Sequence, residues 1–143
     1  MDAKNLVAKA EQTIDAPAEE VWNALTDPQK IKEYMFGATV TSDWKKGSPI
    51  TWSGEMNGKK YEDKGQILEY NPNQILQYSH YSPMSGQPDT PENYHKVTIE
   101  LEEKANKTNV VLTQDKNGSE KEQQESQKNW QMMLEGLKKT VEK

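Results

Sequence analysis

The sequence contains no cysteine, which excludes disulfide bonds, thiol nucleophiles and zinc–thiolate sites. It also contains no arginine, so all 18 basic residues are lysine, and the net charge of the 143-residue chain is −5. Nucleic-acid-binding proteins usually carry a basic face and use arginine for bidentate contacts, so nucleic acid is not an expected partner. No apolar run approaches the roughly 18 residues of a membrane helix, and the N-terminus has no signal-peptide pattern. A cytoplasmic protein without membrane insertion is therefore expected.

Apolar residues are also few, at 32% of the chain against 29% charged residues. This composition is lean for a globular protein but is not that of a disordered one. Four tryptophans and six tyrosines still supply large apolar surfaces. We expect a single domain over residues 1–143, with a thin core or a core built around a cavity.

The hydrophobic pattern predicts a strand, two short helices, six more strands and a long helix. The first strand is expected over residues 4–15, and "DAPAEEVWNALTDP" predicts the first helix. Asp27 is suited to cap the second helix, with Pro28 at its first position. Short alternating runs between residues 38 and 115, separated by turn signals, predict an antiparallel meander.

The C-terminal segment predicts one long amphipathic helix that begins at the cap residue Ser119. An apolar stripe recurs at helical spacing, and residues 119–128 are expected to be a solvated face. A helix and a curved seven-stranded sheet must cover each other's apolar faces, and a strongly bent sheet leaves space beside the helix. The stripe consists of Trp130, Met133, Leu134, Leu137 and Val141.

Three segments resemble the START/Bet v 1-like (SRPBCC) superfamily, in the bacterial branch named after the activator of Hsp90 ATPase. These segments are "TIDAPAEEVWNALTDPQKIKEYMFG", "GQILEYNPNQILQYSH" and "NWQMMLEGLKKTVE". The resemblance implies an α+β helix-grip fold, in which a curved seven-stranded antiparallel sheet surrounds a long C-terminal helix and two short helices follow the first strand. It also implies an enclosed hydrophobic cavity. Most members of the family bind apolar small molecules, and a minority are enzymes.

The only two histidines, His80 and His95, stand at the two ends of a proline-rich loop. Strand alternation places both on the apolar face, and if they are opposed their Cβ atoms lie within about 5 Å. They could hydrogen-bond a polar group of a ligand, act as acid and base, or be partly buried structural residues. The loop could be a lid with Met84 at its tip or a plain surface loop.

The strand over residues 61–69 has two possible registers. Either Tyr61, Asp63 and Ile67 face the interior, or Gln66 and Leu68 do. With Asp63 or Glu69 the histidines could in principle hold zinc, but neither a metal nor a cofactor is expected.

We therefore expect the protein to bind a small apolar or amphipathic molecule between the sheet and the C-terminal helix, with no catalytic residue assigned. Two alternatives stay open: a protein-interaction module, chaperone-associated or stress-related, with a filled core, and a histidine-dependent enzyme on the same fold. The candidate ligand-binding residues are Trp52, Tyr78, His80, Met84, His95, Ile99, Trp130 and Met133.

Overall fold

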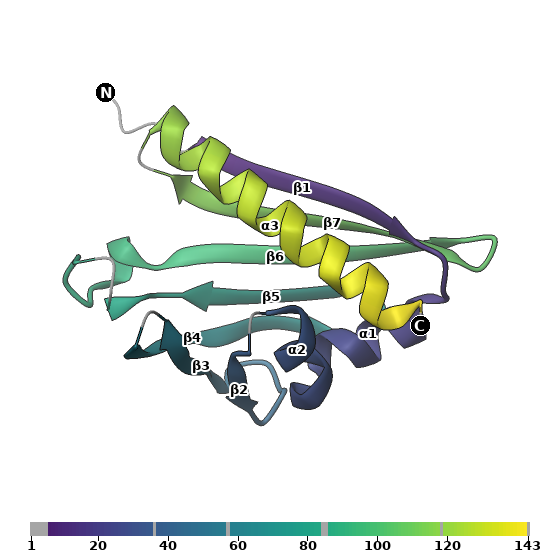
Figure 1. Ribbon diagram of the computed structural model, residues 1–143, viewed down its shortest axis with the longest axis horizontal. Helices are drawn as coiled ribbons and strands as arrows, with labels where there is room; N and C mark the ends of the chain where they lie inside the picture. Colours follow the sequence, from purple (N-terminus) through teal and green to yellow (C-terminus); the bar gives the residue numbers. More distant parts are fainter. Residues whose placement is uncertain (1–5, 36, 57, 84–85, 118, 143) are drawn as a thin grey trace.

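Seven antiparallel strands form one sheet, and a long helix crosses one of its faces (Figure 1). The computed structural model describes residues 6–35, 37–56, 58–83, 86–117 and 119–142. The strand order is β1-β7-β6-β5-β4-β3-β2. The elements are β1 (Leu6–Ile14), α1 (Ala18–Thr26), α2 (Pro28–Tyr34), β2 (Thr39–Ser42), β3 (Pro49–Met56), β4 (Lys59–Asn71), β5 (Ile75–His80), the 3-10 helix η2 (Pro91–Asn93), β6 (His95–Lys104), β7 (Lys107–Asn117) and α3 (Glu120–Val141).

The predicted α+β helix-grip architecture is confirmed, together with the two predicted helix caps. The Asp27 carboxylate accepts a hydrogen bond from the backbone N–H of Gln29 at 3.0 Å, and Pro28 is the first residue of α2. The Ser119 hydroxyl accepts from the N–H of Glu122 at 3.1 Å and so begins α3. These contacts satisfy backbone N–H groups that have no partner within the helix.

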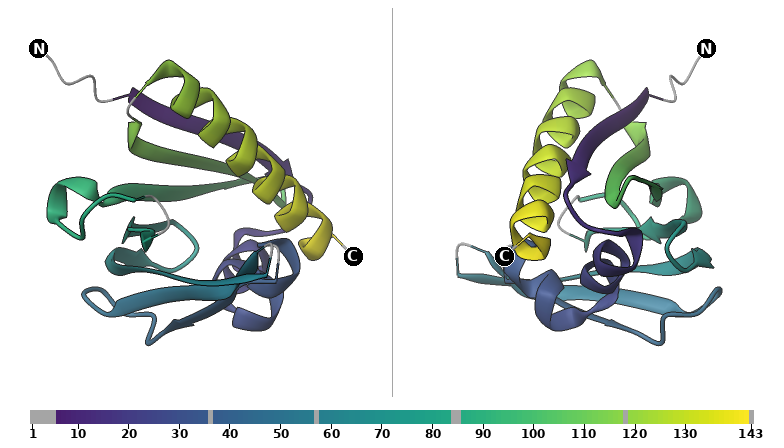
Figure 2. Two further views of the ribbon diagram at one scale, coloured as in Figure 1. Left: turned by 60° about the vertical axis from the view of Figure 1, so that its left-hand side comes forward. Right: turned by 90° about the vertical axis from the view of Figure 1, so that its right-hand side faces the viewer.

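The sheet curves around α3 (Figure 2). The apolar core lies beneath the C-terminal half of that helix. Met133, Leu134 and Leu137 of α3 are buried against the sheet and against α1 and α2. The N-terminal half of α3 lies along β1 and β7, while its C-terminal end reaches α1 and α2 (Figure 1). The two halves of the helix therefore have different neighbours.

The polar half of α3 holds the open edge of β1. Gln123 donates to the Val7 carbonyl at 2.8 Å, and Gln127 accepts from the N–H of Lys9 at 3.3 Å. Gln131 donates to the carbonyl of Glu11 at 3.0 Å and accepts from its N–H at 3.3 Å. Four helical residues rise about 6 Å and two strand residues about 6.7 Å, so the two spacings match.

The expectation of a purely solvated face over residues 119–128 is therefore wrong for Gln123 and Gln127. Their side chains occupy backbone groups that an edge strand otherwise offers to another chain. No helix in the described part of the chain is long and apolar enough to span a membrane.

Candidate functional site

The apolar interior beneath the C-terminal half of α3 is almost completely filled. Its residual void is about 20 Å³, which has room for at most one water molecule. The rings of Trp52 and Tyr78 pack there with centroids 5.0 Å apart. The side chains around the void are Leu25, Ile31, Tyr34, Met35, Val40, Trp44, Ile50, Trp52, Leu76, Tyr78, Ile99 and Met133. The core that was expected to be hollow is therefore closed at this end of the molecule.

A larger cavity of about 420 Å³ lies at the other end, between the sheet and the N-terminal half of α3. Its walls come from the ends of β5, β6 and β7, from α3 and from the described part of the β5–β6 loop (residues 81–83 and 86–94). It is lined by His80, Ser82, Gln87, Glu92, Asn93, His95, Gln114, Lys116, Glu122 and Trp130. We call this space the open-end cavity. Its lining is more polar than the hydrophobic cavity that the resemblance implies.

The two histidines are paired across neighbouring strands, and they lie on the same face as the alternation predicts. His80 of β5 is directly opposite His95 of β6, and the nearest pair on the same face of the sheet is Tyr78 with Val97. Tyr78 and Val97 are buried in the core, and each is two residues from a histidine on its strand. The side chains of both histidines therefore project from the face that α3 covers. The β5–β6 pair thus brings residues 15 positions apart to one wall of the open-end cavity.

Asp63 of β4 hydrogen-bonds His80 and settles the open register of that strand. The Nε2 atom of His80 lies 2.9 Å from Oδ2 of Asp63, with side-chain exposures of 28% and 17%. Ile67 is fully buried, so Asp63 and Ile67 share the inner face. Gln66, whose backbone N–H donates to the Ser79 hydroxyl, lies on the other face together with Leu68. The rings of His80 and Trp52 also pack edge to face, with centroids 5.1 Å apart.

The second oxygen of the Asp63 carboxylate, Oδ1, is buried and has no hydrogen-bond partner among the described residues. Buried polar atoms are normally paired, because an unpaired one loses its hydration without compensation. The carboxylate therefore directs its hydrogen bonding to His80. Sequence reasoning considered Asp63 only as a metal ligand, and the described residues contain no cluster of three or more acidic or histidine side chains suited to a metal.

His95 and Trp130 are each fixed by β7. The Nδ1 atom of His95 lies 2.9 Å from the carbonyl oxygen of Asp115, so it donates the hydrogen. The indole N–H of Trp130 donates to the Gln114 side-chain oxygen at 2.5 Å. The alternation of β7 puts Gln114 on the same face as the buried Leu112. This alternation is visible in the sequence and could have identified Gln114 as an inward-facing residue.

Among the eight predicted ligand-binding residues, the structure brings three to the open-end cavity: His80, His95 and Trp130. It places Trp52, Tyr78, Ile99 and Met133 around the small void in the closed core. Burial raises the pKa of the Tyr78 hydroxyl, so that group stays neutral at physiological pH. Met84, the predicted tip of the loop, lies outside the described residues.

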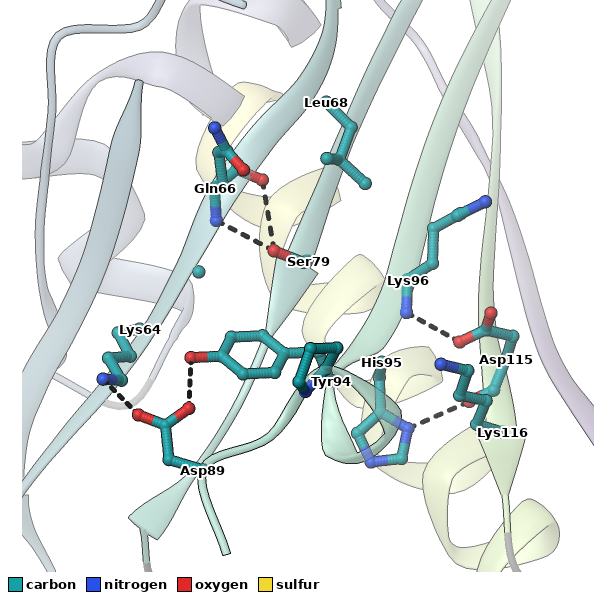
Figure 3. Close-up of a pocket in the computed structure, with 12 residues that line it drawn as sticks. Lys64, Gln66, Leu68, Ser79, Asp89, Tyr94, His95, Lys96, Asp115 and Lys116 are labelled. Carbon is teal, nitrogen blue, oxygen red and sulfur yellow. Dashed lines mark hydrogen bonds and ion pairs between the residues drawn. The ribbon is translucent and has the colours of Figure 1, made fainter. Parts of the chain in front are cut away.

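The β5–β6 loop is anchored to the sheet on the side away from α3 (Figure 3). Lys64 of β4 forms an ion pair with Asp89, and the Tyr94 hydroxyl donates to the same carboxylate at 2.7 Å. The rings of Tyr81 and Tyr94 stack with centroids 5.2 Å apart, and the Tyr81 hydroxyl donates to the carbonyl of Gln87 at 2.5 Å. These contacts hold the loop as a fixed wall of the open-end cavity.

The anchored loop and the outer face of the sheet also border a second hollow, of about 620 Å³, which Figure 3 shows. It is more exposed to solvent than the open-end cavity, and both of its carboxylates are already engaged. Lys64 pairs with Asp89, and the Asp115 carboxylate accepts from the N–H of Lys96 at 2.6 Å.

The anchoring of the loop should depend on pH. A hydrogen bond from Lys64, and to a smaller extent one from Tyr94, lowers the pKa of Asp89 below 3.8. The ionised carboxylate therefore stabilises the anchored loop above that pH, and this stabilisation is lost as pH falls through the pKa of the folded state. The hydrogen bond to Asp89 raises the pKa of the Tyr94 hydroxyl, so the stabilisation from this bond is lost only when the hydroxyl ionises in alkali. Amide exchange protection of residues 86–94 is therefore expected to decrease at both extremes of pH.

The matched control is a second carboxylate of the same loop. Asp89→Asn should lower the protection of residues 86–94 at neutral pH and remove most of its decrease in acid, whereas Glu92→Gln should change neither. Equal protection in Asp89→Asn and the wild type at neutral pH would contradict this role of the ion pair.

The chain is similar to a known protein family and to solved structures of other bacterial proteins. A family model described as activator of Hsp90 ATPase homolog 1-like protein matches residues 15–142. The solution structure of ChR145 from Cytophaga hutchinsonii is 58% identical, with 99% of this chain and 97% of that chain covered and a TM-score of 0.87. None of the curated proteins compared with the chain matches it.

Two more distant structures share the fold. CalU16 from Micromonospora echinospora is 23% identical, with 99% of this chain and 87% of that chain covered and a TM-score of 0.73. DynU16, a protein of the dynemicin biosynthetic locus, is 16% identical, with 97% of this chain and 48% of that chain covered and a TM-score of 0.79. At these identities the likeness concerns the fold alone.

Proposed function

The chain belongs to the activator of Hsp90 ATPase homolog 1-like family, and from this membership we propose that it binds a small amphipathic molecule in the open-end cavity. The observation that carries the proposal is the cavity itself. Its volume of about 420 Å³ falls in the range of roughly 300–1,000 Å³ that small-molecule sites occupy.

The lining indicates the chemistry of the guest. Trp130 and the imidazoles of His80 and His95 supply flat surfaces, while Gln114 and Glu92 supply hydrogen-bonding groups. Burial of apolar area contributes about 25 cal/mol per Å², and paired polar groups fix orientation. A purely apolar guest would leave these polar groups without water or partners, which costs free energy. An amphipathic guest satisfies both parts of the wall.

DynU16 is named as a protein of the dynemicin biosynthetic locus, and its fold is similar to that of this chain. Its identity of 16% supports no transfer of a particular ligand. The identity of the guest therefore follows from the lining of this cavity and not from the relative.

The filled core favours one alternative, a protein-interaction module. The 20 Å³ void beneath the C-terminal half of α3 leaves no space for a ligand there. A protein that uses only its outer surface would have the same closed core. The two functions differ in whether small molecules stabilise the isolated protein.

The test is a melting experiment with a panel of fatty acids, sterols and hydroxylated aromatics. A ligand present at 100 times its Kd adds about 2.7 kcal/mol to the free energy of unfolding. At about 2–4 °C per kcal/mol, the expected increase in Tm is roughly 5–11 °C. No shift with any compound would favour the interaction module.

Two matched variants locate the binding site. Ser82→Phe adds a ring to the wall of the open-end cavity, and Lys96→Phe adds the same ring to the outer hollow. We expect Ser82→Phe to remove the ligand-induced shift and Lys96→Phe to retain it. The reverse pattern would assign binding to the outer hollow and contradict the proposal.

A further inference from the structure

Asp63 fixes which nitrogen of His80 carries the hydrogen. Oδ2 of the Asp63 carboxylate can only accept, so Nε2 of His80, 2.9 Å away, is the donor. In the neutral imidazole the other nitrogen, Nδ1, then holds a lone pair. Because His80 lines the open-end cavity, Nδ1 is the nitrogen that remains for a guest.

We propose that His80 is a general base and Asp63 its positioning residue, so that the protein abstracts a proton from a weakly acidic C–H group of a molecule bound in the cavity. The substrate class is a small molecule whose C–H bond is acidified by a neighbouring carbonyl, imine or nitro group. This inference rests on the proposed function, because the substrate must first occupy the open-end cavity.

The surroundings of the pair suit a base that becomes charged. The Asp63 side chain is 17% exposed, and its Oδ1 has no hydrogen-bond partner among the described residues. Trp52 packs against the His80 ring at 5.1 Å and limits its rotation. When His80 takes up a proton, the imidazolium faces the Asp63 carboxylate in a partly desolvated setting, where opposite charges attract more strongly than in water.

The cavity also holds donors for the negative charge that develops on the substrate. The Gln114 oxygen already accepts from Trp130, which leaves the Gln114 amide N–H groups as donors within the lining. Donors placed where charge develops lower the barrier to its formation.

The step balances without any further reactant. The C–H bond breaks, the proton moves to Nδ1 of His80, and the electron pair left on carbon is delocalised onto the acidifying group. Returning the proton to a different atom of the same molecule gives an isomer and restores neutral His80. The proposed activity is therefore isomerisation by proton transfer, and it consumes neither an oxidant nor a reductant.

The test uses 5-nitrobenzisoxazole, a probe that reports proton abstraction directly. Loss of its C–H proton to a base forms a nitrile, breaks the N–O bond and releases a coloured phenolate, and solvent then takes the proton from the base. General-base catalysis typically contributes about 10²–10⁴-fold, so we expect His80→Gln to lower kcat at least about 100-fold. Asp63→Asn should lower kcat at least about tenfold, since it removes the acceptor that orients the ring.

Three further measurements separate a catalytic role from a structural one. Quenching of tryptophan fluorescence by the probe should give the same dissociation constant for the wild type and His80→Gln. Free imidazole should restore activity to His80→Ala. Histidine ¹⁵N spectra should show His80 with its hydrogen on Nε2. Lys96→Gln, a substitution at the outer hollow and outside the open-end cavity, serves as the control with little change in kcat.

The outcomes distinguish this inference from the binding function. A probe that quenches fluorescence but reacts equally fast with the wild type and His80→Gln overturns the general base and leaves the binding site standing. A hydrogen found on Nδ1 of His80, or no reaction above buffer with a folded wild type, also overturns it. Binding itself is judged separately, by the melting panel and its two phenylalanine variants.

Discussion

Gly65→Ala is expected to lower the free energy of unfolding by about 3 kcal/mol, the upper part of the usual cost of overpacking. A Cβ atom on Gly65 would lie 1.7 Å from the carbonyl oxygen of Ser79 and 2.6 Å from its carbon. Both are backbone atoms of β5, so the strands must move apart. At about 2–4 °C per kcal/mol, the melting temperature should fall by roughly 6–12 °C.

The same movement should disturb the site, because Gly65 lies two residues after Asp63 and the clash lies one residue before His80. The NMR signal of the His80 Nε2–H group, which is hydrogen-bonded to Asp63, should therefore weaken in the Gly65→Ala variant. Gly54→Ala is the matched control, since its Cβ would meet only the side chain of Tyr61, with the hydroxyl at 2.8 Å, which can swing away. Equal destabilisation by the two substitutions would contradict the close approach of β4 and β5.

Leu134→Ala is expected to cost about 2–5 kcal/mol, because truncating a buried leucine loses its transfer free energy and leaves a space that the core does not refill. Leu134 is 0% exposed and belongs to the main core cluster. The melting temperature should fall by roughly 4–20 °C at about 2–4 °C per kcal/mol. Thermal or urea unfolding followed by circular dichroism measures the loss.

Met132→Ala is the control for that prediction, on the same helix and with a side chain that is 51% exposed. It should change stability by less than about 0.5 kcal/mol, as surface substitutions usually do. Because Leu134 does not line the open-end cavity, ligand affinity of the folded Leu134→Ala protein should be unchanged. A greater loss in Met132→Ala than in Leu134→Ala would reverse the assigned orientation of α3.

Local signals made the architecture predictable from the sequence. Asp27 and Ser119 accept the cap hydrogen bonds that their positions indicate, and the apolar stripe of α3 faces the core. The strand alternation also placed His80 and His95 on the same face of the sheet, where the structure pairs them. Each of these features depends on residues close in sequence or on a period of two or 3.6, which a single sequence displays.

The location of the cavity was not predictable in the same way, because it depends on how side chains from distant elements fill a shared volume. Trp52 and Tyr78 close the core beneath the C-terminal half of α3 by packing on each other, and they do so across three strands. The partner of His80 was equally hidden. Asp63 is 17 residues away in sequence, and its register stayed open until the buried Ile67 fixed it.

The edge contacts of β1 show a further limit of sequence patterns. Gln123, Gln127 and Gln131 recur every four residues, which in a polar stretch resembles an ordinary solvated helix face. Their contacts with β1 join residues more than 110 positions apart. Only the tertiary arrangement brings β1 beside the helix, where the four-residue spacing of the glutamines matches the backbone groups of the strand.

The central claim, that a guest occupies the open-end cavity, is tested most directly by an NMR titration of ¹⁵N-labelled protein with the compound that raises Tm most. We predict saturable shifts of the side-chain signals of His80, His95, Gln114 and Trp130, with no change in the indole signal of Trp22, which packs against Tyr70 in the core. Shifts confined to Trp22 and its core neighbours, or to Lys96 on the outer face, would contradict the account.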